Sequence, residues 1–128
     1  MEIRFLIEPS IAAMAAIRAD ETDIKNILTA CENTEKLLLA NKNHAEKDIA
    51  FHTAIALSSK NIVVPKLVPI INSSIPLIRE SAKFTMRDET IEIHREIADA
   101  IAAHDAVRAH DAMYLHLIYN RKHIKSIN

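Results

Sequence analysis

Asp48 and His52 are the two residues whose types and spacing point most directly to chemistry. In an α-helix, residues four apart lie about 40° apart around the axis and about 6 Å apart along it, so both side chains reach the same point beside the helix. A carboxylate and an imidazole on one face are half of a metal site. The same spacing suits an ion pair on a wet helix surface, which is the commoner arrangement on spacing alone.

Two further histidines share an apolar setting with His52. His94 lies among aliphatic residues, as does His116, and each of the three belongs to a different expected helix. An imidazole is buried only if its ring nitrogens find partners, so a single one would be read as a satisfied core histidine. Three of them together with Asp48 are better explained by a shared divalent metal ion, which would satisfy all four ligand groups at once.

The other four histidines are expected elsewhere. His44, His104 and His123 lie in or near polar turns or chain ends, where a solvated surface position is the default. His110 lies six residues before His116, which puts the two on different faces of a helix.

Composition excludes several classes of protein. The 128 residues contain no glycine, which rules out phosphate-cradling loops and dinucleotide fingerprints. A net charge of −1 and the lack of a clustered basic stripe argue against direct contact with DNA. Prolines interrupt the best candidate for a membrane span, and no signal peptide is recognisable, so we expect a cytoplasmic protein with no membrane contact. The single Cys31 is expected to be a reduced, structural thiol on an apolar helix stripe.

The hydrophobic pattern predicts an all-α fold, an antiparallel bundle of about six helices in one domain over residues 1–128. The fourth segment is expected to be a bent or broken helix, because it contains Pro65, Pro69 and Pro76. The expected ranges are 4–19, 22–40, a helix that carries Asp48 and His52 and ends near 58, then 61–83, 88–103 and 105–124.

Several motifs together resemble the FCD domain, the ligand-sensing C-terminal domain of GntR-family transcriptional regulators. The resemblance spans nearly the whole chain with the motifs in the right order. They are Glu2-x-Arg4-x-x-Ile7-Glu8-Pro9 followed by Ala12-Ala13 and Ala15-Ala16, then Asp48-x-x-Phe51-His52-x-x-Ile55, Ser59-x-Asn61, Glu92-x-His94-x-x-Ile97 and Met113-x-x-His116-Leu117.

The resemblance implies a function and assigns roles to particular residues. Asp48, His52, His94 and His116 would bind zinc, nickel or manganese and leave one or two coordination positions open for a small organic-acid effector. Arg4 would anchor the carboxylate of that effector, although a surface ion pair with Glu8, one turn on, explains it equally well. Asn61 and Asn120 are further effector-binding candidates, and for Asn61 the capping of the following helix is the stronger alternative.

The family's regulators carry an N-terminal winged helix-turn-helix, and Met1 stands almost directly before the first motif. We therefore expect a domain that meets DNA only through a missing N-terminal domain and that forms a homodimer through apolar helix faces. One alternative is a small metalloenzyme that uses the same Asp/His₃ site, with Glu92 or Glu96 as the base. The other is a metal-free structural dimerisation module.

Overall fold

The described part of the chain folds into six α-helices. The structure is a computed structural model that describes the backbone of residues 2–82 and 87–127 and the side chains of residues 3–73 and 87–121. The predicted all-α fold is confirmed, and no strand occurs within those ranges. The helices are α1 (Glu2–Arg18), α2 (Glu21–Leu39), α3 (Ala45–Ser58), α4 (Val64–Ala82), α5 (Arg87–Ala102) and α6 (Ala106–Ile127).

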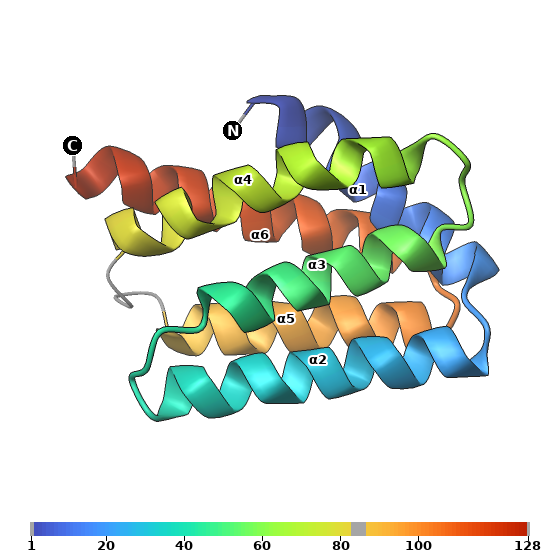
Figure 1. The fold of residues 1–128 in the computed structure, drawn as a ribbon, viewed down its shortest axis with the longest axis horizontal. Helices are drawn as coiled ribbons and strands as arrows, with labels where there is room; N and C mark the ends of the chain where they lie inside the picture. The colour runs from blue at the N-terminus through green and yellow to red at the C-terminus, as the bar shows by residue number, and fades with distance from the viewer. Residues whose placement is uncertain (1, 83–86, 128) are drawn as a thin grey trace.

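Consecutive helices run in alternating directions, as the predicted antiparallel bundle requires (Figure 1). Helix α1 packs against α6, α3 and α5, and α2 packs against α3 and α5. Helix α3 also contacts α4, and α6 contacts both α4 and α5. The core between them holds fully buried Phe51, Ile55, Ile97, Met113 and Leu117. Helices α3, α5 and α6 therefore all present apolar faces to the same interior.

The helix ends are defined without glycine. The Asp20 side chain accepts a hydrogen bond from Asp23 N–H at 2.8 Å, and the Asp23 side chain accepts one from Asp20 N–H at 3.0 Å, which closes a capping box on α2. Asn41, Lys60 and His104 follow the ends of α2, α3 and α5 with φ between 55° and 56°. This left-handed conformation reverses the chain after each helix, a role that glycine takes in most proteins.

Helix α4 is continuous, so of the bent or broken helix that its prolines led us to expect, the break does not occur. Pro65, Pro69 and Pro76 fall within about 40° of one another around the helix axis. Pro65 and Pro69 are exposed, so the carbonyl that Pro69 leaves without a helical partner is on the solvent side of the helix. Val64 and Ile71 point into the core and hold the opposite face.

Three side chains differ in their exposure from what their local sequence predicts. His44 was expected at the surface but is 1% exposed, because it lies one turn before Asp48 on the inward face of α3. Ile17 and Val107 continue the apolar pattern of their helices, which predicts inward positions, but they are 67% and 72% exposed. Ile17 lies on the side of α1 opposite the buried Ile11 and Ala15. His104 is exposed as predicted, and the side chain of His123 lies outside those that are described.

The predicted buried thiol is confirmed, since Cys31 is 5% exposed and has no disulfide partner. Burial raises its pKa to about 11, with a smaller contribution from the negative charge of Glu35. None of the described helices combines the length and the apolar character that a membrane crossing needs.

Cys31 should therefore be unreactive in the folded protein. At pH 8 we expect iodoacetamide to alkylate it on the order of 100-fold more slowly than in urea-unfolded protein, because an ordinary thiol has a pKa of about 8.5 and only the thiolate reacts. Mass spectrometry of timed samples measures both rates.

The raised pKa also fixes the sign of an alkaline effect on stability. The folded state favours the protonated thiol, so this stabilisation is complete below about pH 8.5 and is lost as the pH rises toward the folded pKa of about 11. Urea midpoints should therefore fall more between pH 8 and 10.5 for the wild type than for Cys31→Ala, and an equal fall would contradict the assignment.

Candidate functional site

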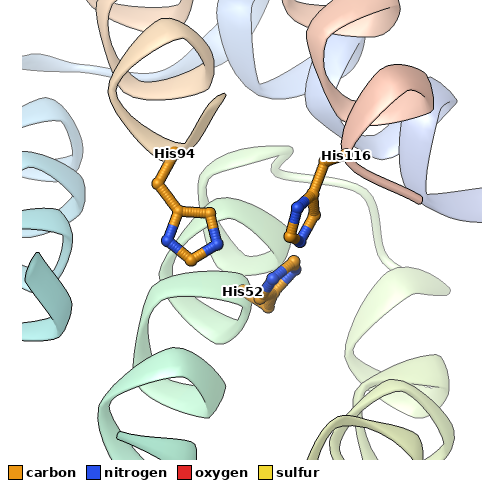
Figure 2. A group of neighbouring side chains, drawn as sticks. All are labelled: His52, His94 and His116. Atoms are coloured by element: carbon orange, nitrogen blue, oxygen red, sulfur yellow. The ribbon is translucent and has the colours of Figure 1, made fainter. Parts of the chain in front are cut away.

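Three histidines from three helices meet in the interior. His52 lies on α3, His94 on α5 and His116 on α6, and Figure 2 shows the rings turned toward one another. All three are at most 3% exposed, and one nitrogen of each ring lies within 4.8 Å of the corresponding nitrogens of the other two. The core positions beside them, such as Phe51, Ile97 and Leu117, fix the rotation of each helix so that the histidine beside them also faces inward.

Asp48 adds a carboxylate to the cluster. It is completely buried, and its Oδ1 lies 3.4 Å from Nε2 of His52 and 3.5 Å from Nε2 of His94. Two atoms bound to one metal ion at about 2.0–2.1 Å are separated by roughly 3.0–3.4 Å. The spacing of Asp48 with these two imidazoles therefore fits a shared ion.

Ring contacts orient the imidazoles. The rings of His52 and His116 are stacked, with centroids 5.4 Å apart and an interplanar angle of 24°. The Phe51 ring lies 4.8 Å from the His94 ring and forms an apolar wall beside it. These neighbours limit the rotamers of the rings, so the site is largely formed before any ligand arrives.

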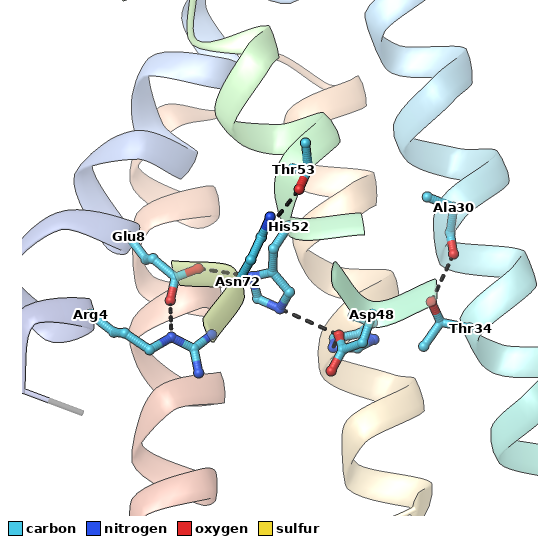
Figure 3. A network of polar contacts seen from close by, with 9 residues as sticks. Arg4, Glu8, Ala30, Thr34, Asp48, His52, Thr53 and Asn72 are labelled. Carbon is cyan, nitrogen blue, oxygen red and sulfur yellow. Dashed lines mark hydrogen bonds and ion pairs between the residues drawn. The ribbon is translucent and has the colours of Figure 1, made fainter. Parts of the chain in front are cut away.

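Glu8 also belongs to the site, although the sequence motifs did not assign it a role there. Its Oε1 accepts a hydrogen bond from Nδ1 of His52 at 2.8 Å, and its Oε2 accepts one from Nε of Arg4, as Figure 3 shows. Glu8 is 3% exposed and Arg4 is 1% exposed. The pairing of Arg4 with Glu8 one turn away was foreseen as an alternative, but the pair is buried, whereas the sequence analysis placed it on the surface.

A signal for that burial was present in the sequence. Glu8 lies at helical spacing from Ile11, Ala12 and Ala15, all of which are buried on the inner face of α1. A charged residue in phase with such a stripe must have a buried partner, and for Glu8 that partner lies on α3.

Opposing effects set the protonation of this pair. Burial by itself raises the pKa of the Glu8 carboxyl, but the charge and hydrogen bond of His52 and those of Arg4 outweigh it and leave the pKa below its ordinary value. Burial by itself lowers the pKa of His52, but the Glu8 charge and the hydrogen bonds with Asp48 and Glu8 raise it above its ordinary value. Without a metal ion, the two neighbouring carboxylates therefore favour a proton on His52. A ligating imidazole is neutral, so a metal ion would replace that proton.

Arg4 keeps unused hydrogen-bonding capacity. Its Nη1 and Nη2 are both buried, and neither has a hydrogen-bond partner among the described residues. A guanidinium presents its donors in a planar fork that matches the two oxygens of a carboxylate. Buried donors of this kind are costly when unpaired, so they mark a position for an acceptor from outside the described chain.

The two asparagines that were predicted to bind the effector, Asn61 and Asn120, differ in their positions and contacts. The Asn61 side-chain oxygen accepts hydrogen bonds from the backbone N–H groups of Val63 at 2.8 Å and Val64 at 3.3 Å, which caps the start of α4. Its amide nitrogen contacts Met14 Sδ at 3.7 Å, so the effector-binding role of Asn61 stays a prediction that these contacts do not require. Asn120 lies one turn beyond His116 on α6 and is 6% exposed.

The carboxylates considered as catalytic bases lie on the outside. Glu92 is exposed, and Glu96 forms a two-pronged ion pair with Arg108 at 2.6 and 2.8 Å across the α5–α6 surface. Among the described residues, the carboxylates that contact the histidine cluster are Asp48 and Glu8. The structure therefore shows no contact between the cluster and Glu92 or Glu96, the two residues considered as bases.

Comparison with known proteins identifies a family. The sequence model of the FCD domain matches residues 1–118. The solved structure of Streptococcus agalactiae GntR is similar, with a TM-score of 0.82 and 34% sequence identity over 94% of this chain and 56% of that chain.

Two curated relatives are transcriptional regulators. The uncharacterized HTH-type transcriptional regulator YcbG of Bacillus subtilis (strain 168) is 29% identical over 124 residues, which are 97% of this chain and 52% of the relative. The galactonate operon transcriptional repressor of Escherichia coli (strain K12) is 33% identical over 113 residues, which are 81% of this chain and 47% of the relative. The chain thus spans about half the length of the relatives it matches.

The contacts of Asn61 make its capping role testable. Asn61→Ala should lower the free energy of unfolding by about 1 kcal/mol, whereas Asn61→Asp, which keeps the acceptor oxygen, should leave it nearly unchanged. Urea titration of the three proteins measures the difference. Equal stability of the alanine and aspartate variants would show that the cap contributes nothing.

Proposed function

The chain belongs to the FCD domain family of GntR-family transcriptional regulators, and we propose that it binds one divalent transition-metal ion together with a small organic-acid effector. The observation that carries this proposal is the convergence of the buried His52, His94 and His116, with the buried Asp48 carboxylate beside His52 and His94.

The donor set supports the metal part of the proposal. Three imidazole nitrogens and one carboxylate oxygen suit zinc, nickel or manganese. One ion could take donor atoms from side chains of α3, α5 and α6 at the same time. The bound ion would supply a Lewis-acid position to which an oxygen ligand can coordinate.

Arg4 supports the effector part. Its Nη1 and Nη2 are held in place because Nε is already fixed by Glu8, which itself contacts the metal ligand His52. A carboxylate between Arg4 and the metal would receive two charge-assisted hydrogen bonds. One relative is named as the repressor of a galactonate operon, and galactonate is a sugar acid with one carboxylate. We therefore place small hydroxy and sugar acids first among candidate effectors.

The regulatory consequence follows from the helices that supply the ligands. An ion held by His52, His94 and His116 would draw α3, α5 and α6 together, because one ligand comes from each helix. A carboxylate that bridges the ion and Arg4 would add α1 to this contraction. In a regulator that carries a DNA-binding domain before α1, this movement of the helices would change the orientation of that domain. Only that domain would contact DNA.

We also propose that two copies of the chain associate in the cytoplasm. Large apolar side chains are exposed on α1 and α6, helices that pack against each other. A second copy is the partner that would cover such faces most simply, since soluble oligomers are most often symmetric dimers. The residues concerned are Ile3, Leu6 and Ile17 on α1 and Val107, Tyr114 and Leu115 on α6.

Metal content tests the central proposal. The untagged protein, purified without chelator, should contain close to one divalent ion per chain by elemental analysis. His94→Ala/His116→Ala should lose that ion while keeping its helical circular dichroism, because two of the four ligands are gone.

A surface control removes non-specific binding from this comparison. His104→Ala/His110→Ala deletes two histidines outside the cluster and should retain the ion. Failure of the wild type to take up zinc, nickel or manganese on incubation would refute the metal site.

Arg4→Met tests the carboxylate anchor separately. The metal-loaded wild type should be stabilised saturably by acetate, lactate or galactonate, by up to about 2.7 kcal/mol at a hundredfold excess over Kd. The variant should bind metal normally but require at least about tenfold more carboxylate, because the two Nη donors are lost. Arg18→Met on the same helix is the control, and an unchanged carboxylate response in Arg4→Met would contradict the assignment.

A further inference from the structure

Glu8 connects two parts of the buried network that come from different helices. One carboxylate oxygen accepts from Nδ1 of His52 on α3 at 2.8 Å, and the other accepts from Nε of Arg4 on its own helix α1. All three side chains are at most 3% exposed, so no water competes freely for these hydrogen bonds. Glu8 is therefore held on both sides and has little freedom to move.

The hydrogen bond to Glu8 determines which nitrogen of His52 faces the cluster. With Nδ1 directed at Glu8, Nε2 points to Oδ1 of Asp48, which lies 3.4 Å away. A carboxylate acceptor keeps the proton on Nδ1. Once His52 is neutral, the lone pair must be on Nε2, the nitrogen that faces Asp48 and His94.

We propose that Glu8 is a positioning residue that fixes the tautomer and orientation of His52 for metal binding. This inference rests on the metal site proposed above. Glu8 acts through His52 and does not itself bind the ion, because its two oxygens are directed at Nδ1 of His52 and at Arg4. Arg4 in turn balances the charge of Glu8. The carboxylate can therefore accept a hydrogen bond from Nδ1 of His52 without adding uncompensated charge to the core.

A plain counter-ion role for Glu8 is the competing explanation. In that case Glu8 would serve only to neutralise Arg4, and its contact with His52 would have no effect on metal affinity. The two roles separate when Arg4 is removed first, because Glu8 then has no arginine to neutralise.

The test compares Arg4→Met with Arg4→Met/Glu8→Leu and Arg4→Met/Glu8→Gln. Removing both charges in the leucine variant avoids a buried arginine without a partner, which would endanger folding. Zinc affinity is measured for each by competition with a chromophoric chelator, beside wild type and the surface control Glu35→Gln. Cobalt-loaded samples give visible spectra, and ¹⁵N NMR of the zinc-loaded proteins, in which His52 is neutral, reports which of its ring nitrogens carries the proton.

We expect Glu35→Gln to bind zinc within about threefold of wild type, and Arg4→Met, which keeps Glu8 beside His52, is the reference against which the two double variants are judged. Arg4→Met/Glu8→Leu should bind 10- to 100-fold more weakly, the usual cost of losing a partner behind a metal-bound histidine. It should also show an altered cobalt spectrum and a mixture of His52 tautomers. Arg4→Met/Glu8→Gln keeps an acceptor oxygen and should recover most of the affinity.

Two results would overturn the proposal. Equal zinc affinity and equal cobalt spectra for Arg4→Met and Arg4→Met/Glu8→Leu would show that Glu8 does not position His52. An equal loss in the leucine and glutamine variants would show that the hydrogen bond is not the cause. A wild type that binds no zinc, nickel or manganese is a different result, because it refutes the metal site itself and the role of Glu8 with it.

Discussion

The constraint on which this structure depends is the burial of several charged and polar side chains in the core of a small helical bundle. Arg4, Glu8, Asp48 and the three clustered histidines are each at most 3% exposed. Isolated charges would be unstable there, so their positions must allow them to satisfy one another. The rotation of α1, α3, α5 and α6 about their own axes is fixed by this requirement as much as by the apolar packing.

Much of the fold and part of the site could be predicted from the sequence. The period of apolar residues gave the six helices, and the aliphatic neighbours of His94 and His116 indicated that both face inward. Glu8 was misplaced because its charge and its spacing from Arg4 matched an ordinary surface pair. Only the packing of α1 on α3, a contact between distant segments, shows that its partner is His52.

The sequence does not show which side of a helix packs against a distant segment, and this also explains the other differences between prediction and structure. His44 was judged by its polar neighbours, although its depth depends on how α3 packs. The continuity of α4 depends on the placement of Pro65 and Pro69 on the solvent side, which a count of prolines does not show. In each case the local residue types were read correctly, and the missing information was which side of the helix faces the core.

The order of the clustered histidines along the chain has a further consequence. His52 and His94 are separated by about forty residues and His94 and His116 by about twenty, so an ion held by all three would close two long loops at once. A covalent cross-link over a loop of about forty residues restricts the unfolded chain by about 4 kcal/mol. The proposed ion would thus act as a reversible cross-link. The availability of metal would then affect the stability of the folded domain as well as what the domain binds.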